Sequence, residues 1–449
     1  MRQIIFLAII FSFAIHLPAC KKSSGDGNGG GSNNSDRLKD STILYARDIY
    51  LWYDKIPSSF KARNYADPDA IMEAIRDYSI EPGFTDPVDR WSFAVTKNVW
   101  DDLSQGISSD FGLGIFYYNS NDLRVSFVEP ASPAGKANIK RSWQIKQINN
   151  SSNISTSNIN FVSNAIFNST SVTLLLGREG KADTTVALTA ATYLEQPIIL
   201  DTIYTTGATK TGYLVFNSFL GDTTKIKNEF ARIFNKFTTA GVSDVVLDLR
   251  YNGGGYVLLQ DELANYLAPP DANGQIMEEQ KFNNKYSNYN STSRFSRKGS
   301  LDLDRLFVIV SQNTASASEL LINSLKPYLN VQLVGPTRTH GKPVGYFPIP
   351  VMDWYIFPVS FRTVNKNGQG NYFDGFTLNH QVGDGLDKAW GDITESCLAA
   401  ALKYISTGAY ARVVEPNGIR QLEPQTETSN DLLGAKRFRG AVALPKNLH

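Results

Sequence analysis

The segment that most constrains this chain is a strand–turn–helix unit within residues 306–325. The apolar run 306–310 predicts a buried strand, and the run 320–325 predicts a helix. Between them lies a turn of small residues, 313–319, which contains Ser316. A serine in this turn stands at a helix N-terminus, where unpaired backbone N–H groups favour negative charge. The unit therefore predicts an α/β fold with a polar site at the end of a strand.

Two interpretations of this serine are open at this point. Serine is a common helix N-cap, and Glu319 suits the first turn of a helix. A hydroxyl beside free N–H groups is also what acyl transfer needs, because the reaction uses a nucleophile with an oxyanion site next to it. Downstream, Lys342 follows a glycine and is a candidate base.

A second motif lies at residues 245–255. The run 245–249 is almost continuously apolar, as expected for a strand covered on both faces. A glycine-rich turn, 253–255, follows it, at the strand end where α/β sheets commonly build sites. We expect Arg250, which lies between strand and turn, to pair with a carboxylate and shape this turn. Further strands and helices at 213–216, 226–237, 258–267, 331–334, 354–359 and 394–405 complete a predicted mixed α/β core over residues 197–410.

The N-terminal residues have the features of a targeting segment. Arg2 precedes the apolar run 4–15, which has the length of a signal peptide and is short for a membrane span. Residues 17–20 resemble the lipobox of bacterial lipoproteins, in which Cys20 becomes lipidated; a plain secretory signal is the alternative. We therefore expect residues 1–20 to be a lipoprotein signal and 21–37 a flexible tether. The expected location is the cell envelope, as a lipoprotein facing the periplasm or on the cell surface.

Composition limits the partners that we expect for this chain. The chain has 44 basic and 43 acidic residues, a net charge of +1 and no basic run, so we expect no nucleic-acid partner. We expect no metal and no cofactor. With Cys20 lipidated, Cys397 has no partner for a disulfide and is expected to be a small buried apolar residue.

The remaining regions are assigned from periodicity. Residues 38–103 are expected to form a helical N-terminal domain. The short strands and helices over 104–196 resemble a PDZ domain, whose Gly112–Leu113–Gly114–Ile115 loop would offer N–H groups to the carboxylate of a peptide that adds to the sheet edge. An ordinary glycine turn is the alternative for this loop. Residues 411–449 lack periodicity and are expected to be a loosely attached tail.

Three segments occur in order, 248–255, 314–319 and 341–342, with apolar strands between them. Together they resemble the C-terminal processing (tail-specific) proteases, which combine a helical N-terminal part, a PDZ domain and a mixed α/β serine protease core. The resemblance implies that Ser316 is the nucleophile and Lys342 the general base. It also implies that the backbone N–H groups of Gly253 and Ala317 bind the oxyanion. Proteins or peptides with apolar C-termini are the implied substrates.

The chemistry requires an uncharged lysine. An ordinary lysine has a pKa of about 10.4, and burial lowers it by about 3 to 5 units. Two residues depart from the family pattern, since Tyr346 replaces a common glutamine and Pro343 a common glycine. His340 is a rival base, because a related branch uses histidine. A non-catalytic peptide- or ligand-binding protein on a decayed protease scaffold is the alternative function, and a glycan-binding lipoprotein is a third option.

Overall fold

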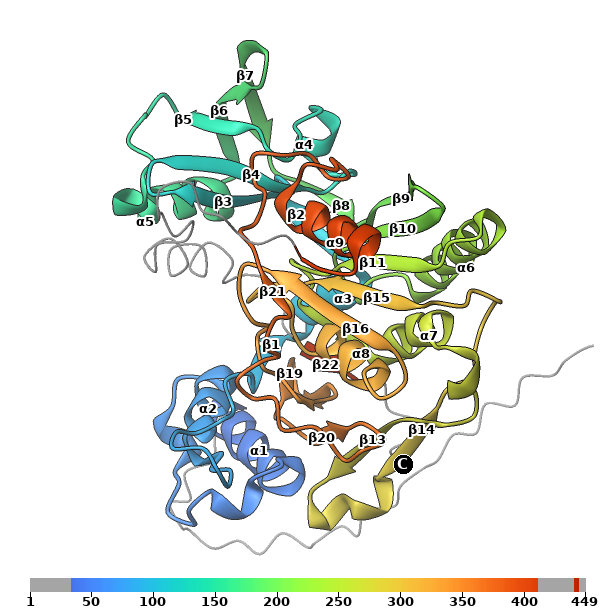
Figure 1. The fold of residues 1–449 in the computed structure, drawn as a ribbon. Coiled ribbons are helices and arrows are strands. Elements are labelled where there is room, and N and C mark those ends of the chain that lie inside the picture. Colours follow the sequence, from blue (N-terminus) through green and yellow to red (C-terminus); the bar gives the residue numbers. More distant parts are fainter. Residues whose placement is uncertain (1–33, 411–439, 444–449) are drawn as a thin grey trace, which may run out of the picture.

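The computed structural model describes residues 34–410 and 440–443 (Figure 1). The predicted signal peptide, the lipidation of Cys20 and most of the predicted tether lie outside these residues. Within the described ranges, no helix combines the length and apolar character that crossing a bilayer requires.

A six-stranded sheet forms the centre of the molecule, in the order β21-β16-β15-β11-β10-β9. All neighbouring pairs are parallel except β9 with β10, which is antiparallel. The predicted mixed α/β core is confirmed. Strands β10, β11, β15 and β16 agree with the predicted apolar runs, whereas β9 and β21 were not predicted. Their bounds are Ile198–Thr206 (β9), Thr209–Phe216 (β10), Asp244–Asp248 (β11), Arg305–Ile309 (β15), Asn330–Gly335 (β16) and His380–Gln381 (β21).

Helices cover both faces of this sheet. Alternate side chains of β11 show the two faces: Val245 and Leu247 pack in the cluster that contains α6, α7 and α8, whereas Val246 packs with α9. Asp222 caps the start of α6 by accepting from two backbone N–H groups, and Gly241 ends the helix with a positive φ of 72°. The helix bounds are Thr223–Ala240 (α6), Val257–Leu267 (α7), Ala317–Leu325 (α8) and Ser396–Thr407 (α9).

The N-terminal region is mainly helical, as predicted. It contains α1 (Asn34–Ile49), α2 (Pro68–Ile75) and α3 (Lys97–Gln105). Two boundaries differ from the prediction. The tether was predicted to reach residue 37, but α1 begins at Asn34, with Asp36 in its first turn, where a carboxylate is favourable.

The second difference is a strand, β1 (Phe93–Thr96), which pairs antiparallel with β19 (Trp354–Phe357). This pairing spans 264 positions of sequence at Phe93 and Phe357, and no local pattern signals it. With β18 (Ile349–Val351), these strands form a three-stranded sheet. The helical region is therefore joined to the core by main-chain hydrogen bonds.

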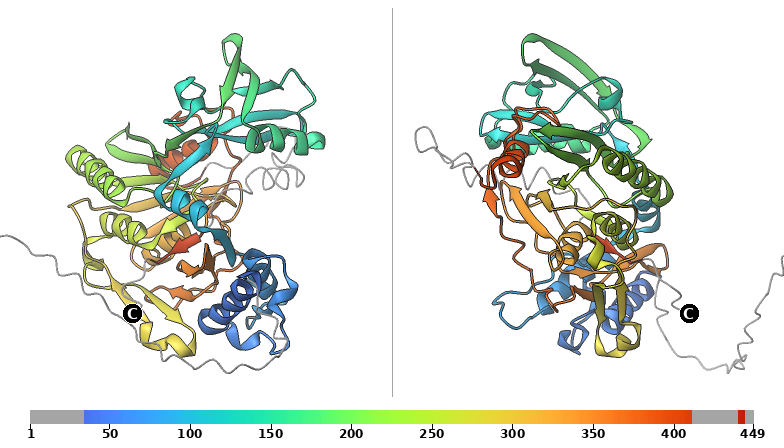
Figure 2. Two further views of the ribbon diagram at one scale, coloured as in Figure 1. Left: turned by 180° about the vertical axis from the view of Figure 1, so that it is seen from behind. Right: turned by 45° about the vertical axis from the view of Figure 1, so that its right-hand side comes forward.

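Residues 104–196 form a five-stranded antiparallel sheet, β3-β4-β5-β6-β7, with its own apolar core. It lies at the opposite end of the molecule from α1 and α2 in all three views (Figures 1 and 2). The element positions agree with the predicted strands and short helices, and the PDZ assignment stays a prediction. The bounds are Leu113–Asn119 (β3), Asp122–Val128 (β4), Pro133–Lys136 (α4), Gln144–Ile148 (β5), Ile159–Ser163 (α5), Ser171–Arg178 (β6) and Lys181–Thr189 (β7); β2 (Ile107–Asp110) pairs with β8 (Ala191–Leu194).

Two smaller sheets complete the described fold. One has the order β14-β13-β20-β17, and the other pairs β12 with β22 in parallel. Strand β22 belongs to the C-terminal tail, so the expectation that the whole tail is loosely attached is wrong for these residues. Their bounds are Gly254–Tyr256 (β12), Ile276–Phe282 (β13), Ser291–Arg294 (β14), Val344–Gly345 (β17), Phe361–Val364 (β20) and Gly440–Val442 (β22).

Candidate active site

Ser316 stands immediately before α8, at the carboxyl end of the central sheet. Its backbone has φ 58° and ψ −111°, an unusual conformation for a residue other than glycine that costs about 1 to 3 kcal/mol. The side chain is 1% exposed, and its Oγ makes no hydrogen bond with any residue that the structure describes. A strained turn thus presents a buried hydroxyl whose bonding capacity is unused.

Glu319 joins the serine turn to the lysine loop. Its Oε2 accepts hydrogen bonds from the backbone N–H of Ser316 at 2.9 Å and of Lys342 at 2.8 Å, and its Oε1 accepts from Gly341 at 2.7 Å. Burial raises the pKa of this carboxyl, and the Thr339 hydroxyl and the three N–H groups partly oppose that shift. Because one oxygen binds both N–H groups, the backbones of Ser316 and Lys342 are held next to each other.

Lys342 is buried, with 1% of its surface exposed. Burial lowers its pKa well below the usual value, and the negative charges of Asp89 and Glu319 only partly oppose this. The Nζ lies 3.8 Å from the ring centre of Tyr346 and 5.7 Å from that of Trp91. The amine therefore sits against an aromatic wall, in surroundings that favour its neutral form.

The two predicted catalytic groups come from different elements and meet at one place. Ser316 comes from the start of α8, and Lys342 from the loop before β17. No hydrogen bond joins Oγ of Ser316 to Nζ of Lys342 in this conformation. The structure therefore brings the two residues together through Glu319 but leaves the contact between their reactive atoms unmade.

The imidazole of His340 is engaged elsewhere. Its Nε2 accepts a hydrogen bond from the indole N–H of Trp91 at 2.8 Å, and its backbone N–H donates to the Thr314 carbonyl at 2.9 Å. These bonds fix the loop that carries Lys342 against the serine turn and against the N-terminal region.

Asn252 links the glycine turn to the serine turn. Its carbonyl accepts from the N–H of Ala315 at 3.1 Å and from the hydroxyl of Ser318 at 3.0 Å. Its side-chain oxygen accepts from the N–H of Gly254 at 2.9 Å. The two motifs are thus bonded directly, although Asn252 and Ser318 are 66 positions apart in the sequence.

The predicted oxyanion donors lie on this linked pair of turns. The N–H of Gly254 is used by Asn252, whereas those of Gly253 and Ala317 donate no hydrogen bond to a described residue. Gly254 has φ 104°, and a Cβ on it would stand 3.0 Å from the nitrogen of Ala317. Only glycine fits this approach, which brings the glycine turn against the start of α8.

A buried charge network supports the glycine turn from behind. Arg250 is fully buried and forms ion pairs with Asp248 at 2.7 Å, Glu395 at 2.8 Å and Asp384 at 2.8 Å, which confirms the predicted pairing. Arg141, from the loop before β5, also binds Asp384, at 2.6 Å. Burial alone would raise the pKa of Asp384, but Arg141 and Arg250 lower it to about 2.

A cavity of about 240 Å³ connects the predicted peptide-carboxylate loop with the catalytic turns. Leu113, Gly114 and Ile115 line it together with Gly253 and Asn313. The loop is therefore next to the site.

The surroundings of the 112–115 loop are acidic, which the sequence did not indicate. The N–H of Gly112 is already donated to the carboxylate of Asp110, and Glu129 and Glu195 line the same cavity. Burial raises the pKa of Glu129 to about 8. Of the four predicted loop residues, Gly112 therefore offers no N–H to a ligand in this conformation.

Three contributors to the site were not identified from the sequence. Trp91 and Asp89 come from the N-terminal region, and nothing local marks them. Glu319 was interpreted only as a first-turn residue, although the Ser316–Glu319 spacing is that of a capping box and was a usable signal. Among residues 34–410 and 440–443, no group of three or more His, Cys, Asp or Glu side chains is arranged to hold a metal ion.

The fold and the site define the class of protein: a multidomain α/β protein built around a serine at a helix N-terminus and a buried lysine. Two regions of the chain match models of peptidase family S41. Residues 210–376 match the model of "Peptidase family S41", and residues 44–93 match that of the "Peptidase S41 N-terminal domain".

Individual relatives agree with this assignment. A "Probable CtpA-like serine protease" of Staphylococcus aureus strain N315 is 28% identical over 266 residues, 57% of this chain and 49% of that protein. The match thus spans about half the length of this relative. A crystal structure of an S41 protease from Bacteroides fragilis NCTC 9343 superposes with a TM-score of 0.66, at 24% identity, over 82% of this chain and 97% of that one. This likeness shows that the fold is shared.

Proposed function

We propose that the protein is a serine endopeptidase that uses Ser316 as nucleophile and Lys342 as general base. The observation that carries the proposal is the burial of Lys342 against Tyr346, with its backbone bonded to the same carboxylate oxygen as that of Ser316. The matches to models of peptidase family S41 and the serine proteases among the relatives support it.

In the proposed reaction Lys342 first accepts a proton and later donates it. The neutral amine of Lys342 takes the proton of Ser316 as Oγ attacks the scissile carbonyl. The backbone N–H groups of Gly253 and Ala317 stabilise the oxyanion of the tetrahedral intermediate. Lys342 then returns the proton to the leaving amine, and water releases the acyl group by the same route. A lysine stem has four rotatable bonds, so Nζ can reach Oγ when substrate closes the site.

Two features of the site favour lysine over histidine as the base. The acceptor nitrogen of His340 is occupied by the indole of Trp91, which leaves it to position the loop. Tyr346 replaces the orienting glutamine with an aromatic face. Burial of Lys342 disfavours the charged amine and so keeps the amine unprotonated at a lower pH.

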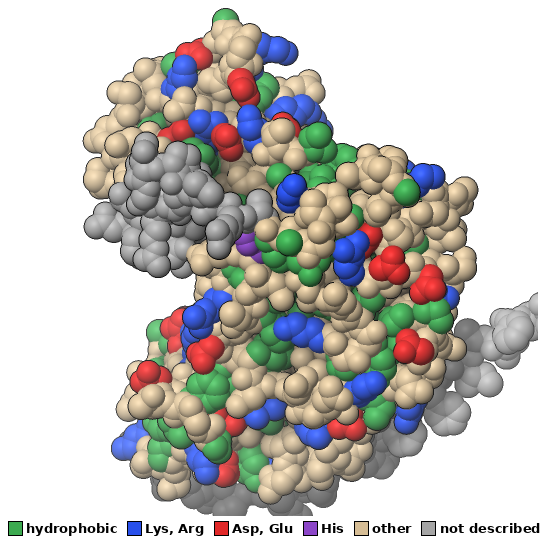
Figure 3. Space-filling model, in the orientation of Figure 1, with side chains coloured by type: hydrophobic (Ala, Val, Ile, Leu, Met, Phe, Trp, Pro, Cys, Tyr) green, Lys and Arg blue, Asp and Glu red, His purple; other side chains and the backbone are tan. Residues whose placement is uncertain are grey.

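We further propose that the substrates are proteins or peptides with apolar C-termini, engaged by residues 104–196. The cavity that joins the 113–115 loop to Gly253 supports this. The described face in Figure 3 carries both signs of charge without a large patch of one sign. This face therefore gives no support for a polyanionic partner such as a nucleic acid. Anchoring to a membrane through Cys20 remains a proposal from the sequence.

A fluorophosphonate probe tests the catalytic proposal. We expect it to label the wild-type protein and not the Ser316→Ala variant. Ser324→Ala, on the same helix, is the matched control and should be labelled normally. Labelling should decrease as the pH falls, because protonated Lys342 cannot accept a proton. Absence of labelling in folded wild-type protein, at alkaline pH as well, would favour the non-catalytic binding protein.

A further inference from the structure

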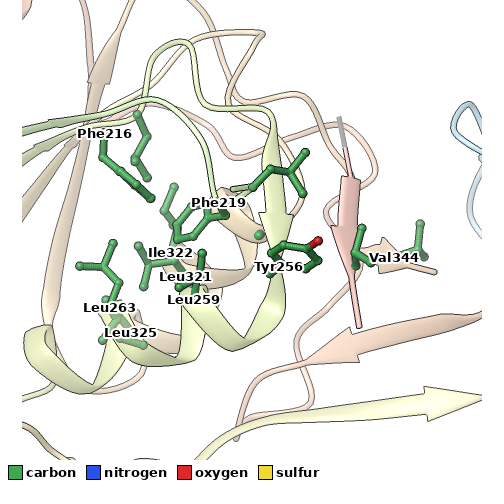
Figure 4. Close-up of a cluster of buried hydrophobic side chains, with 14 of the residues drawn as sticks. Phe216, Phe219, Tyr256, Leu259, Leu263, Leu321, Ile322, Leu325 and Val344 are labelled. Carbon is green, nitrogen blue, oxygen red and sulfur yellow. The ribbon is translucent and has the colours of Figure 1, made fainter. Parts of the chain in front are cut away.

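A segment of the chain's own C-terminal tail lies in the candidate active site. Strand β22 runs parallel to β12, with Gly440, Ala441 and Val442 opposite Gly254, Gly255 and Tyr256. On its other side, Val442 bridges to Tyr346, and the N–H of Ala443 donates to the Tyr346 carbonyl at 3.1 Å. Figure 4 shows β22 between the segments that carry Tyr256 and Val344.

Both neighbours of β22 belong to the catalytic machinery. The glycine turn before β12 supplies the proposed oxyanion donor Gly253, and its carbonyl accepts the N–H of Gly440 at 3.0 Å. The segment on the other side follows Lys342 and contains Tyr346, which contacts the lysine amine. Strand β22 thus bonds through its backbone both to the segment that carries Gly253 and to the segment that carries Lys342 and Tyr346.

The tail also approaches the serine helix. A Cβ on Gly254 would stand 2.6 Å from the carbonyl oxygen of Gly440 and 3.0 Å from the nitrogen of Ala317. A peptide carbonyl of the tail is therefore next to a proposed oxyanion donor. Val442 is fully buried in the core cluster that includes Val344, Tyr346 and Tyr256, so the segment is anchored by apolar contact as well as by hydrogen bonds.

We propose that residues 440–443 are an intramolecular peptide ligand of the catalytic groove, which substrate must displace. The proposal rests on the function proposed above and adds a competitor carried by the chain itself. The ligand class of this groove is an extended peptide whose backbone lies close to Gly254, because a Cβ on Gly254 would stand 2.6 Å from the carbonyl oxygen of Gly440. Backbone pairing on both sides makes the mode of binding strand addition.

A tethered ligand competes strongly even when its intrinsic affinity is modest. A ligand on the same chain binds at an effective concentration, which can be as high as about millimolar and then equals or exceeds many KM values. If the tail occupies the groove about nine-tenths of the time, the apparent affinity for substrate is about tenfold lower than that of the open groove.

The full-length Val442→Lys variant tests this proposal. A lysine cannot be buried unpaired at this fully buried position, so β22 should leave the groove. We expect the KM for a peptide substrate to decrease about tenfold, with kcat unchanged. Val442→Ile, which keeps the side chain apolar, is the matched control and should behave like wild type. An unchanged KM in a Val442→Lys protein that melts cooperatively would overturn the proposal.

Binding of the detached segment gives a second measurement that does not depend on catalysis. A labelled synthetic peptide of residues 439–445 is added to the full-length Ser316→Ala/Val442→Lys protein and to Ser316→Ala alone. We expect fluorescence anisotropy to show binding to the first and at least about tenfold weaker binding to the second. Equal binding to both proteins, or binding equal to that of a scrambled peptide, would overturn the proposal. Binding without probe labelling of wild type would instead contradict only the peptidase function.

Discussion

At the scale of single residues, burying Lys342 lowers the stability of the folded protein at neutral pH. Its pKa in the folded protein is lower than in the unfolded chain, because burial disfavours the ammonium form. Below the unfolded pKa of about 10.4, the unfolded state therefore binds more protons, and the protein loses stability as the pH falls towards the folded pKa. Below the folded pKa, the lysine is protonated in both states, so the loss of stability no longer changes with pH.

We predict that Lys342→Met abolishes activity but stabilises the fold at neutral pH. Each pH unit between the folded and unfolded pKa values corresponds to about 1.4 kcal/mol, so the gain should be largest at neutral pH and vanish as the pH approaches about 10. Urea unfolding at several pH values measures it. Lys61→Met, at an exposed lysine, is the control and should show no such dependence. A gain from Lys342→Met that does not vary with pH would contradict the proposed cause.

The residues of the proposed site come from motifs that a sequence can show, and their catalytic roles stay a prediction. Ser316, Lys342, Gly253 and Ala317 lie in short contiguous motifs, so their types and spacing carry the signal. The positions of Trp91, Asp89 and the carboxylate of Glu319 depend on contacts between distant segments. A local pattern has no information about such contacts, which explains why these residues were missed.

At the scale of elements, the glycine turn depends on the charge network behind β11. Arg250 compensates the charges of Asp248 and Glu395, and none of the three side chains is more than 2% exposed. Removing the guanidinium leaves two buried carboxylates without their cation, which costs more than losing an exposed ion pair.

We predict that Arg250→Met lowers the free energy of unfolding by about 3 to 5 kcal/mol, because it uncovers buried charge. Lys146→Ala is the control, since the pair of Lys146 with Asp183 is about 40% exposed on both sides and should contribute less than about 1 kcal/mol. Urea unfolding curves of the two variants and wild type give both values. Similar small losses in both variants would show that the network is not important for stability.

Elements with a strong period were predictable, and short ones were not. Strand β11 and helices α6 and α8 repeat apolar residues at the spacing of their element, so one segment suffices to identify each. Strands β12 and β22 have three residues each and contain glycines that weaken any strand preference. They exist because the tail and the glycine turn pair with each other, and only the folded chain provides that pairing.

At the scale of the whole molecule, the site is assembled from regions that span nearly the entire described chain. Trp91 comes from the N-terminal region, Ser316 and Lys342 from the core, and Gly440 from the tail. Arg141 ties the 104–196 region to Asp384 of the core, and the cavity between these regions reaches Gly253. The 104–196 region therefore lies next to the glycine turn and the serine turn.

The acidic lining of this cavity should make the binding of a carboxylate there depend on pH. Glu129 is buried beside the 113–115 loop and has a pKa of about 8, so it is mostly neutral at pH 7 and becomes anionic above pH 8. The C-terminal carboxylate of a substrate is ionised throughout this range. We predict that the KM for a peptide with a free carboxylate increases about fivefold or more from pH 7 to 9, because two anions then share a poorly solvated cavity. The same peptide with a C-terminal amide should show little change. Glu129→Gln keeps the oxygen that accepts the N–H of Gln196 and should abolish the increase, whereas parallel changes for acid and amide would show that the carboxylate does not bind there.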